Sequence, residues 1–293
     1  MRNFDDTLSG SLLFIRFKLH QWSATVKDKK LKREIEENKE ADSGTHEARR
    51  HLCAPEFGAI RKLGNKIRNE IYKVSFSMAN VANMDGEVWR VMPSLVYDAQ
   101  KPKIQKMIRE WSDLVSFQCE TEDRWNGTIE RDLKRQGKSA NRGDYPSLEK
   151  LRNCFHIEFN IRPFSVSQTM LCDIFSEAAE DIDKAAEERA KEITENMIQE
   201  SFERIHNPLK ELVSAMRGEK QYFKDSTVVG IEEMVALMRG FNITNNPQIT
   251  EILDDISNSL FGLDPKALRK SESDRERVAN TAQGIVDKLE SYF

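Results

Sequence analysis

The stretch Phe155-His-Ile-Glu-Phe-Asn-Ile-Arg162 decides the fold, because it alternates like a strand and stands just before a long helical pattern. Its apolar side chains take every second position, which is typical of a strand with one buried face. Proline cannot donate to a sheet ladder, so the strand should end at Pro163. Between Gln168 and His206, apolar residues recur at helical spacing without glycine or proline. This predicts one helix of about 39 residues and roughly 60 Å.

A second strand pattern lies near the beginning of the chain. Residues 12–20 alternate between apolar and mostly polar side chains in the same way as residues 155–162. An isolated strand is not stable in water, so we expect these two strands to pair. The segment 27–50 is dense in charge and has little to bury, which predicts a mobile loop with at most a frayed helical turn.

Two helical patterns separate the strands. From Ile60 to Val81, apolar residues three and four apart form a heptad seam, and Pro55 suits its first turn. A short apolar connector at 88–93 leads to a second seam, from Ile104 to Leu133. Two such helices joined by a connector predict an antiparallel helical hairpin, closed by a basic loop at 134–144.

The last third of the chain reads as shorter helices. Asn207-Pro208, Asn246-Pro247 and Asp264-Pro265 each have the character of a helix start. The sequence therefore predicts a mainly α protein with a small antiparallel β element. A long helical hairpin and a long helix pack with a two-stranded sheet in a domain over 1–206, and a helical region follows over 207–293.

Composition narrows the class of protein. Charged residues are 32% of the 293 residues and the net charge is −4, so nothing in the global balance favours nucleic acid. The four cysteines are widely spaced, no signal peptide is visible, and no run of 18 apolar residues exists. We expect a reduced, cytoplasmic protein without a membrane span, in the host cell cytoplasm if the protein is phage-encoded.

Catalytic and metal-binding motifs are absent from the sequence. There is no Walker A motif, dinucleotide fingerprint, H-E-x-x-H or nucleophile elbow, so an enzyme is the less favoured class and no catalytic residue is assigned. His51-x-Cys53 and Cys154-x-His156 offer the four ligand types of a zinc site. Their one-residue gaps are tighter than the usual two to four, so we expect neither a metal nor another cofactor.

Two sets of residues are candidates for binding. A basic set at the hairpin tip could contact phosphates, although it lacks interleaved aromatic residues for stacking on bases; it comprises Arg131, Lys134, Arg135, Lys138 and Arg142. For a protein partner, Trp89 in the connector is one candidate contact. The apolar residues Ile198, Phe202 and Ile205 are the other, either covered by the C-terminal helices or joined to a second copy in a homo-oligomer.

The order of elements resembles a phage and prophage protein family of unknown function. The likeness covers about residues 8–210 and rests on four stretches: Leu12–Trp22, which ends in His-Gln-Trp, the seam Ile60–Val81, the connector Val91-Met-Pro93, and Phe155–Phe164. Genes of that family often lie near those of MoxR-type AAA+ ATPases and von Willebrand A domain proteins. The resemblance implies an accessory role beside such proteins and carries over no active-site residue.

Two functions follow as hypotheses. The first is a non-enzymatic helical adaptor or assembly protein, phage-encoded, that acts through protein–protein contacts. The alternative is a single-stranded nucleic-acid-binding accessory protein of phage replication or recombination, which would use the basic set. A salt-dependent interaction with single-stranded DNA separates the two.

Overall fold

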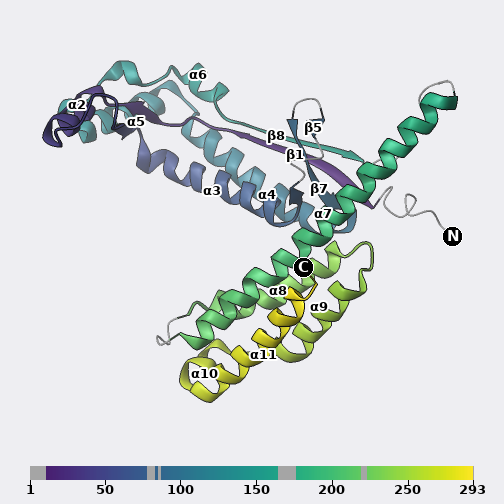
Figure 1. Cartoon of the computed structure of the whole chain (residues 1–293). Coiled ribbons are helices and arrows are strands. Elements are labelled where there is room, and N and C mark those ends of the chain that lie inside the picture. Colours follow the sequence, from purple (N-terminus) through teal and green to yellow (C-terminus); the bar gives the residue numbers. More distant parts are fainter. Residues whose placement is uncertain (1–10, 78–82, 85–86, 164–175, 219–222, 293) are drawn as a thin grey trace. The chain divides into compact units, whose positions relative to one another are not determined.

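The chain divides into two units, each built from segments that are far apart in the sequence. The structure is a computed structural model, and it describes residues 11–77, 83–84, 87–163, 176–218 and 223–292 (Figure 1). Unit 1 comprises Met1–Arg16, Val74–Gln100 and Ile161–Phe293, and unit 2 comprises Phe17–Lys73 and Lys101–Asn160. This division differs from the boundary at 206 that the sequence predicts, because the segments 12–20, 94–118 and 156–163 each contribute residues to both units.

Three elements contribute residues to both units: β1 (Leu12–His20), α4 (Ser94–Gln118) and β8 (His156–Pro163). The elements that belong to unit 2 alone are β2 (Thr25–Lys27), α2 (Lys29–Asn38), β3 (Arg49–His51), α3 (Ala54–Lys73), α5 (Glu122–Gln136), the 3₁₀ turns η1 (Gly137–Ser139) and η2 (Arg142–Asp144), and α6 (Leu148–Asn153). Those of unit 1 alone are β4 (Phe76–Ser77), β5 (Asn83–Met84), β6 (Glu87–Val88), β7 (Arg90–Pro93), α7 (Ser176–Arg217), α8 (Asp225–Phe241), α9 (Pro247–Leu260), α10 (Pro265–Lys270) and α11 (Glu272–Glu290).

The predicted pairing of the two strands is confirmed. β1 and β8 are neighbours in a four-stranded sheet with the order β4-β7-β1-β8. The sheet is larger than predicted, because the apolar connector contains strand β7, which pairs antiparallel with β1 and sets Leu12 opposite Pro93. Four residues are too few to show a period of two, so the sequence pattern could not distinguish this strand from a connector. β8 is also less covered than predicted, since Ile161 is 38% exposed.

The mainly α character and the antiparallel hairpin of α3 and α4 are as predicted. Lys103 on α4 pairs with Glu70 on α3, and farther along α4 the indole of Trp111 lies against Gly64. Residues that come later in α4 contact residues that come earlier in α3, so the two helices run antiparallel. The seam residues Ile60, Ile67 and Ile71 are buried, whereas Met78 and Val81 at its predicted end lie outside the described residues.

The second seam is two helices rather than one. The chain leaves α4 at Gln118, and α5 begins at Glu122 with Thr121 as its N-cap. The Thr121 hydroxyl accepts the N–H of Arg124, and Glu122 and Asp123 place negative charge in the first turn. A capping threonine followed by two acids stabilises a new helix start, which is the sequence signal that interrupts the seam.

The segment 27–50 is ordered, contrary to the prediction of a mobile loop. It contains α2, framed by the β2–β3 ribbon in which Thr25 lies opposite His51. Asp28 caps α2 by accepting the N–H of Leu31, and the buried Glu36 carboxylate accepts the N–H of Gly44. These side-chain contacts with the backbone stabilise a segment that has few apolar residues to bury.

Helix α7 passes through the point where the sequence predicts a new helix. Its described part begins at Ser176 and continues to Arg217 with Pro208 inside it, while the predicted start at Gln168 lies outside the described residues. An interior proline costs about 3 kcal/mol. The buried stripe on α7 continues past it through Leu209 and Leu212, and burial of such side chains, at roughly 1.5–3 kcal/mol each, outweighs that cost.

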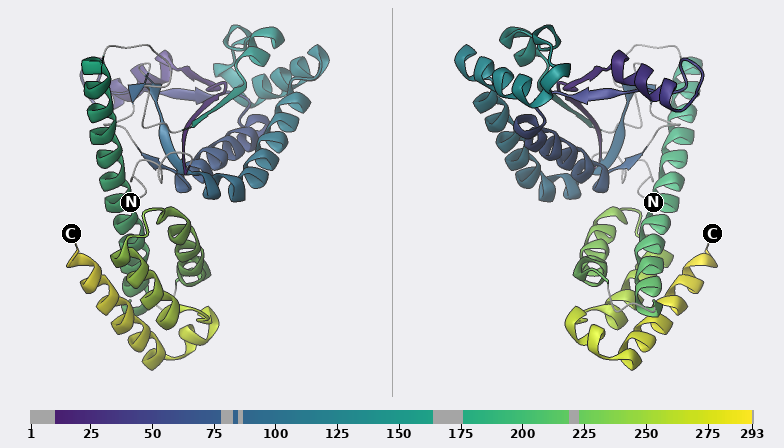
Figure 2. Two further views of the ribbon diagram at one scale, coloured as in Figure 1. Left: turned by 90° about the vertical axis from the view of Figure 1, so that its right-hand side faces the viewer. Right: turned by 90° about the vertical axis from the view of Figure 1, so that its left-hand side faces the viewer.

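The C-terminal helices form a bundle with the second half of α7. α7 packs against α8 and α11, and α9 packs against the same two helices (Figures 1 and 2). Asn246 and Asp264 cap α9 and α10, each with proline in the first turn, as predicted from the sequence. Among the described residues, no helix combines the length and the apolar character needed to cross a membrane.

Candidate functional site

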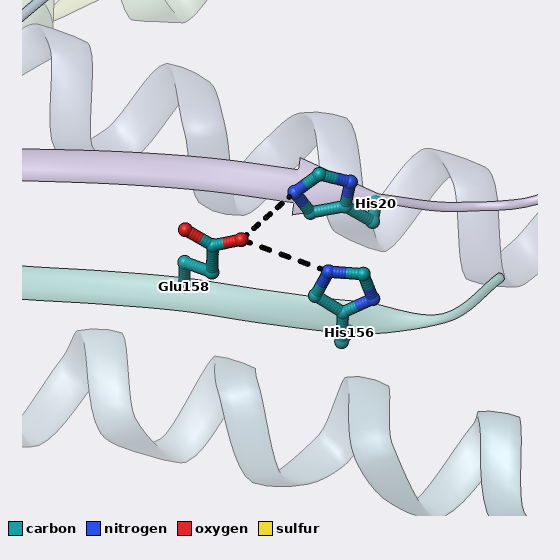
Figure 3. Close-up of side chains that lie close together, drawn as sticks. All are labelled: His20, His156 and Glu158. Atoms are coloured by element: carbon teal, nitrogen blue, oxygen red, sulfur yellow. Dashed lines mark ion pairs between the residues drawn. The ribbon is translucent and has the colours of Figure 1, made fainter. Parts of the chain in front are cut away.

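Two histidines and a glutamate meet where β1 ends and β8 begins, within unit 2. His20 is the last residue of β1, His156 is the first residue of β8, and Glu158 lies two residues farther along β8. Residues two apart on a strand share a face, so the two side chains of β8 point to the same side. Figure 3 shows all three side chains converging between the two strands.

The imidazole rings of His20 and His156 are stacked. Their centroids lie 3.9 Å apart, and their planes differ by 9°. Three residues toward the middle of each strand, the rings of Phe17 and Phe159 make an edge contact at 6.3 Å between centroids. A step of three residues forward along β1 corresponds to a step of three residues backward along β8, as expected for antiparallel neighbours. The strand register therefore places one histidine beside the other.

Glu158 bridges the two rings. Its Oε1 lies 3.2 Å from Nε2 of His20 and 3.7 Å from Nε2 of His156 (dashed lines in Figure 3). The three potential ligand atoms all lie within 4.8 Å of one another, and no other group of three His, Cys, Asp or Glu residues comes as close among the described residues. Imidazole nitrogen and carboxylate oxygen both bind divalent transition metals, so these are the side chains that could hold one.

The structure does not assemble the two histidines and two cysteines that the sequence offers as zinc ligands. His156 stacks on His20, which is outside that set, and Cys154 Sγ donates to the Lys150 carbonyl. Cys53 is buried, and burial together with the Asp132 carboxylate raises the pKa of its thiol to about 12.

Arg135, one of the five residues of the basic set, is part of a buried network. The carboxylate of Asp132 accepts the backbone N–H of Cys53 at 2.8 Å, the hydroxyl of Tyr145 at 2.8 Å, and the guanidinium of Arg135. Burial acts to raise the pKa of Asp132, but these hydrogen bonds outweigh it and hold the pKa below its usual value. Arg135 therefore neutralises a buried carboxylate, while its own side chain is 42% exposed. Its expected contact with phosphates stays a prediction.

Of the remaining four basic residues, two have intramolecular partners. Arg131 forms an ion pair with Glu56 at 3.5 Å, and Arg142 donates to the side chain of Asn126 at 2.7 Å. Lys134, near the end of α5, and Lys138 in η1 are exposed, and neither takes part in an ion pair within the described segments. Within the basic set, these two lysines therefore differ from the three arginines, which have partners inside the chain.

Trp89, the candidate partner contact in the connector, is buried. Its side chain is 1% exposed. The guanidinium groups of Arg16 and Arg162 lie 5.4 Å and 4.7 Å from the ring centroids of Trp89. These three residues belong to unit 1. Cation–π contacts of this kind stabilise packing inside a unit and leave the indole no free surface for a partner.

The apolar set on α7 is covered by the chain itself. Phe202 and Ile205 are buried, Ile198 is half-buried, and the ring of Phe202 lies 6.0 Å from that of Tyr292, just after α11. Of the two alternatives that the sequence left open, the C-terminal helices fold back over these residues. The homo-oligomer stays a prediction, but this surface no longer supports it.

The two units carry opposite net charges, which the sequence average conceals. Unit 2 has 26 Lys and Arg and 19 Asp and Glu, a formal charge of +7. The whole chain has 45 Lys and Arg and 49 Asp and Glu. Unit 1 therefore has 19 Lys and Arg and 30 Asp and Glu, a formal charge of −11. A segregation of this size produces fields of opposite sign that steer differently charged partners.

A comparison of the chain with protein-family models, curated proteins and solved structures finds no match.

Proposed function

We propose that this protein is a non-enzymatic adaptor that acts in the cytoplasm through protein–protein contacts. The observation that carries the proposal is the charge of the two units, +7 and −11. Complementary charge contributes mainly to the choice of partner and to the rate of encounter. A basic unit and an acidic unit on one chain therefore favour two partners of opposite surface charge.

The resemblance to the phage family supplies the class of partner. We infer that the partner is a MoxR-type AAA+ ATPase or a von Willebrand A domain protein. The test is size-exclusion chromatography with light scattering on the chain mixed with each purified partner from the same genome, at low and at high salt. A complex that weakens with salt is the expected result, because surface charges are screened within a Debye length of about 8–10 Å.

Charge-reversal variants separate the two units. Lys62 and Lys66 are exposed on α3 in unit 2, and Glu188 and Glu192 are exposed on α7 in unit 1. Lys62→Glu with Lys66→Glu should weaken one complex, and Glu188→Lys with Glu192→Lys should weaken the other. Failure of both partners to bind, or equal effects of both double variants on one partner, contradicts an adaptor with two charged surfaces.

Single-stranded nucleic acid is the second candidate ligand, supported by the charge of unit 2 and the two exposed lysines. The test is fluorescence anisotropy with a single-stranded oligonucleotide over a range of salt. If these lysines bind phosphates, Lys134→Ala with Lys138→Ala reduces the salt slope of the association constant by about 0.7 for each phosphate that the protein no longer neutralises. Lys184→Ala with Lys191→Ala, which removes the same charge from unit 1, is the matched control.

A further inference from the structure

We propose that His20, His156 and Glu158 form a binding site for a divalent transition metal, with zinc as the ion that fits best. The three residues come from two neighbouring strands and bring two imidazole nitrogens and a carboxylate oxygen together. This is a ligand set in which zinc keeps a further position for water. The inference is independent of the adaptor function, since it rests on the geometry of three side chains and not on the net charges of the units.

Two of the three spacings within the cluster already match those of zinc ligands. Ligand atoms at about 2.1 Å from a tetrahedral ion lie about 3.4 Å from one another. The Glu158 Oε1 to His Nε2 distances of 3.2 Å and 3.7 Å fall on either side of that value. The third spacing, between the ligand atoms of the two imidazoles, is within 4.8 Å. A change in the directions of the side chains would bring both nitrogens to one ion.

The required change is a tilt of the stacked rings. Parallel imidazoles direct their Nε2 lone pairs side by side, whereas a shared ion needs them to converge. The side chains of His20, Glu158 and His156 are 42%, 37% and 52% exposed, so they can rotate without displacing core residues.

Charge also favours a bound cation here. Glu158 supplies one negative charge beside the two imidazoles, and neutral imidazole is the form in which histidine binds a metal. Magnesium and calcium prefer sets made of oxygen, so two nitrogen ligands select against them. A bound ion would join the end of β1 to the beginning of β8 and stabilise unit 2, because it binds only the folded state.

The test uses the full chain without an affinity tag, after treatment with a chelator that is then removed. Zinc binding is measured by isothermal titration and by metal analysis after dialysis. The expected result is about one zinc per chain, with an affinity that falls at least about tenfold in His20→Gln, His156→Gln and Glu158→Gln. All three side chains are partly exposed, and circular dichroism verifies that each variant folds.

Two matched controls make the result specific. His51 is exposed and is not in the cluster, so His51→Gln should bind zinc as the parent does. Zinc should also raise the melting temperature of the parent and of His51→Gln, but not that of His20→Gln. Cys154→Ser should change nothing, because its thiol does not belong to the set.

Three outcomes would overturn the proposal. The first is no saturable zinc binding to the parent protein. The second is zinc affinity unchanged in both His20→Gln and His156→Gln. The third is displacement of zinc by equimolar magnesium or calcium, which would indicate binding to exposed carboxylates rather than to the two imidazoles.

Discussion

Gly64 on α3 lies so close to Trp111 on α4 that a β-carbon on the glycine would be 3.1 Å from the indole Nε1. The same β-carbon would be 2.9 Å from Cδ2 of Leu19, just before the end of β1. The glycine therefore allows both a helix and a strand to approach the backbone of α3. An added methyl group has no free space there.

We expect Gly64→Ala to destabilise the protein by about 1–3 kcal/mol, because overpacking forces side chains or backbone to shift. Gly58→Ala in the same helix is the matched control, since nothing lies within 4 Å of a β-carbon at that position. Alanine is a better helix former than glycine by about 1 kcal/mol, so the control should be neutral or stabilising. Urea unfolding of both variants measures the difference, and equal effects of the two substitutions would show that α3 and α4 do not meet at Gly64.

The sequence predicts those parts of the fold that carry a long periodic pattern. The strands at 12–20 and 155–162 and the seam through Ile60, Ile67 and Ile71 each repeat often enough to identify the element. For the seam the pattern also identifies the buried face, whereas the buried residues of β1, Leu12, Phe14 and Ile15, belong to both faces of the strand. Strand β7 has four residues and α2 has few apolar ones, so neither produces such a pattern. Capping and ladder hydrogen bonds, which depend on single residues, determine these two elements instead.

The histidine cluster could have been found from the sequence by one further step. The two strands were expected to pair, and an antiparallel register that sets Phe17 near Phe159 places His20 beside His156. Spacing along the chain instead favoured His51 and Cys53. The unequal charge of the two units was not predictable in this way, because each unit gathers segments whose association only the fold reveals.

Asp132→Ala should destabilise the protein by about 3–5 kcal/mol, the range for the loss of one partner from a buried pair. The substitution leaves the N–H of Cys53 and the hydroxyl of Tyr145 without their acceptor, and it leaves Arg135 without its carboxylate. Chemical denaturation measures the loss. Tyr145→Phe removes only one hydrogen bond and should cost about 0.5–1.5 kcal/mol, so a similar cost for both variants would contradict a network centred on Asp132.

The same carboxylate should make stability depend on pH in the acid range. The pKa of Asp132 is lower in the folded protein than in the unfolded chain, where it is about 4. Its contribution is therefore fully present above about pH 4 and is lost as the pH falls through the folded-state pKa. Asp132→Asn should lose less stability than the parent between pH 6 and pH 3. Urea midpoints at the two pH values measure this, and an identical loss in parent and variant would mean that Asp132 titrates normally.

Pro208→Ala tests whether α7 is one helix through the point where the sequence predicts a new one. Inside a helix, proline lacks the N–H that would bond four residues back, so alanine should stabilise the protein, by up to about 3 kcal/mol. At a helix start that N–H has no helical partner, and the change would be neutral or unfavourable. Pro247→Ala in the first turn of α9 is the matched control and should show this second behaviour. Thermal melting of the two variants distinguishes the cases: a higher midpoint for Pro208→Ala alone indicates a continuous helix, and equal behaviour of both variants indicates that the chain begins a new helix at Asn207.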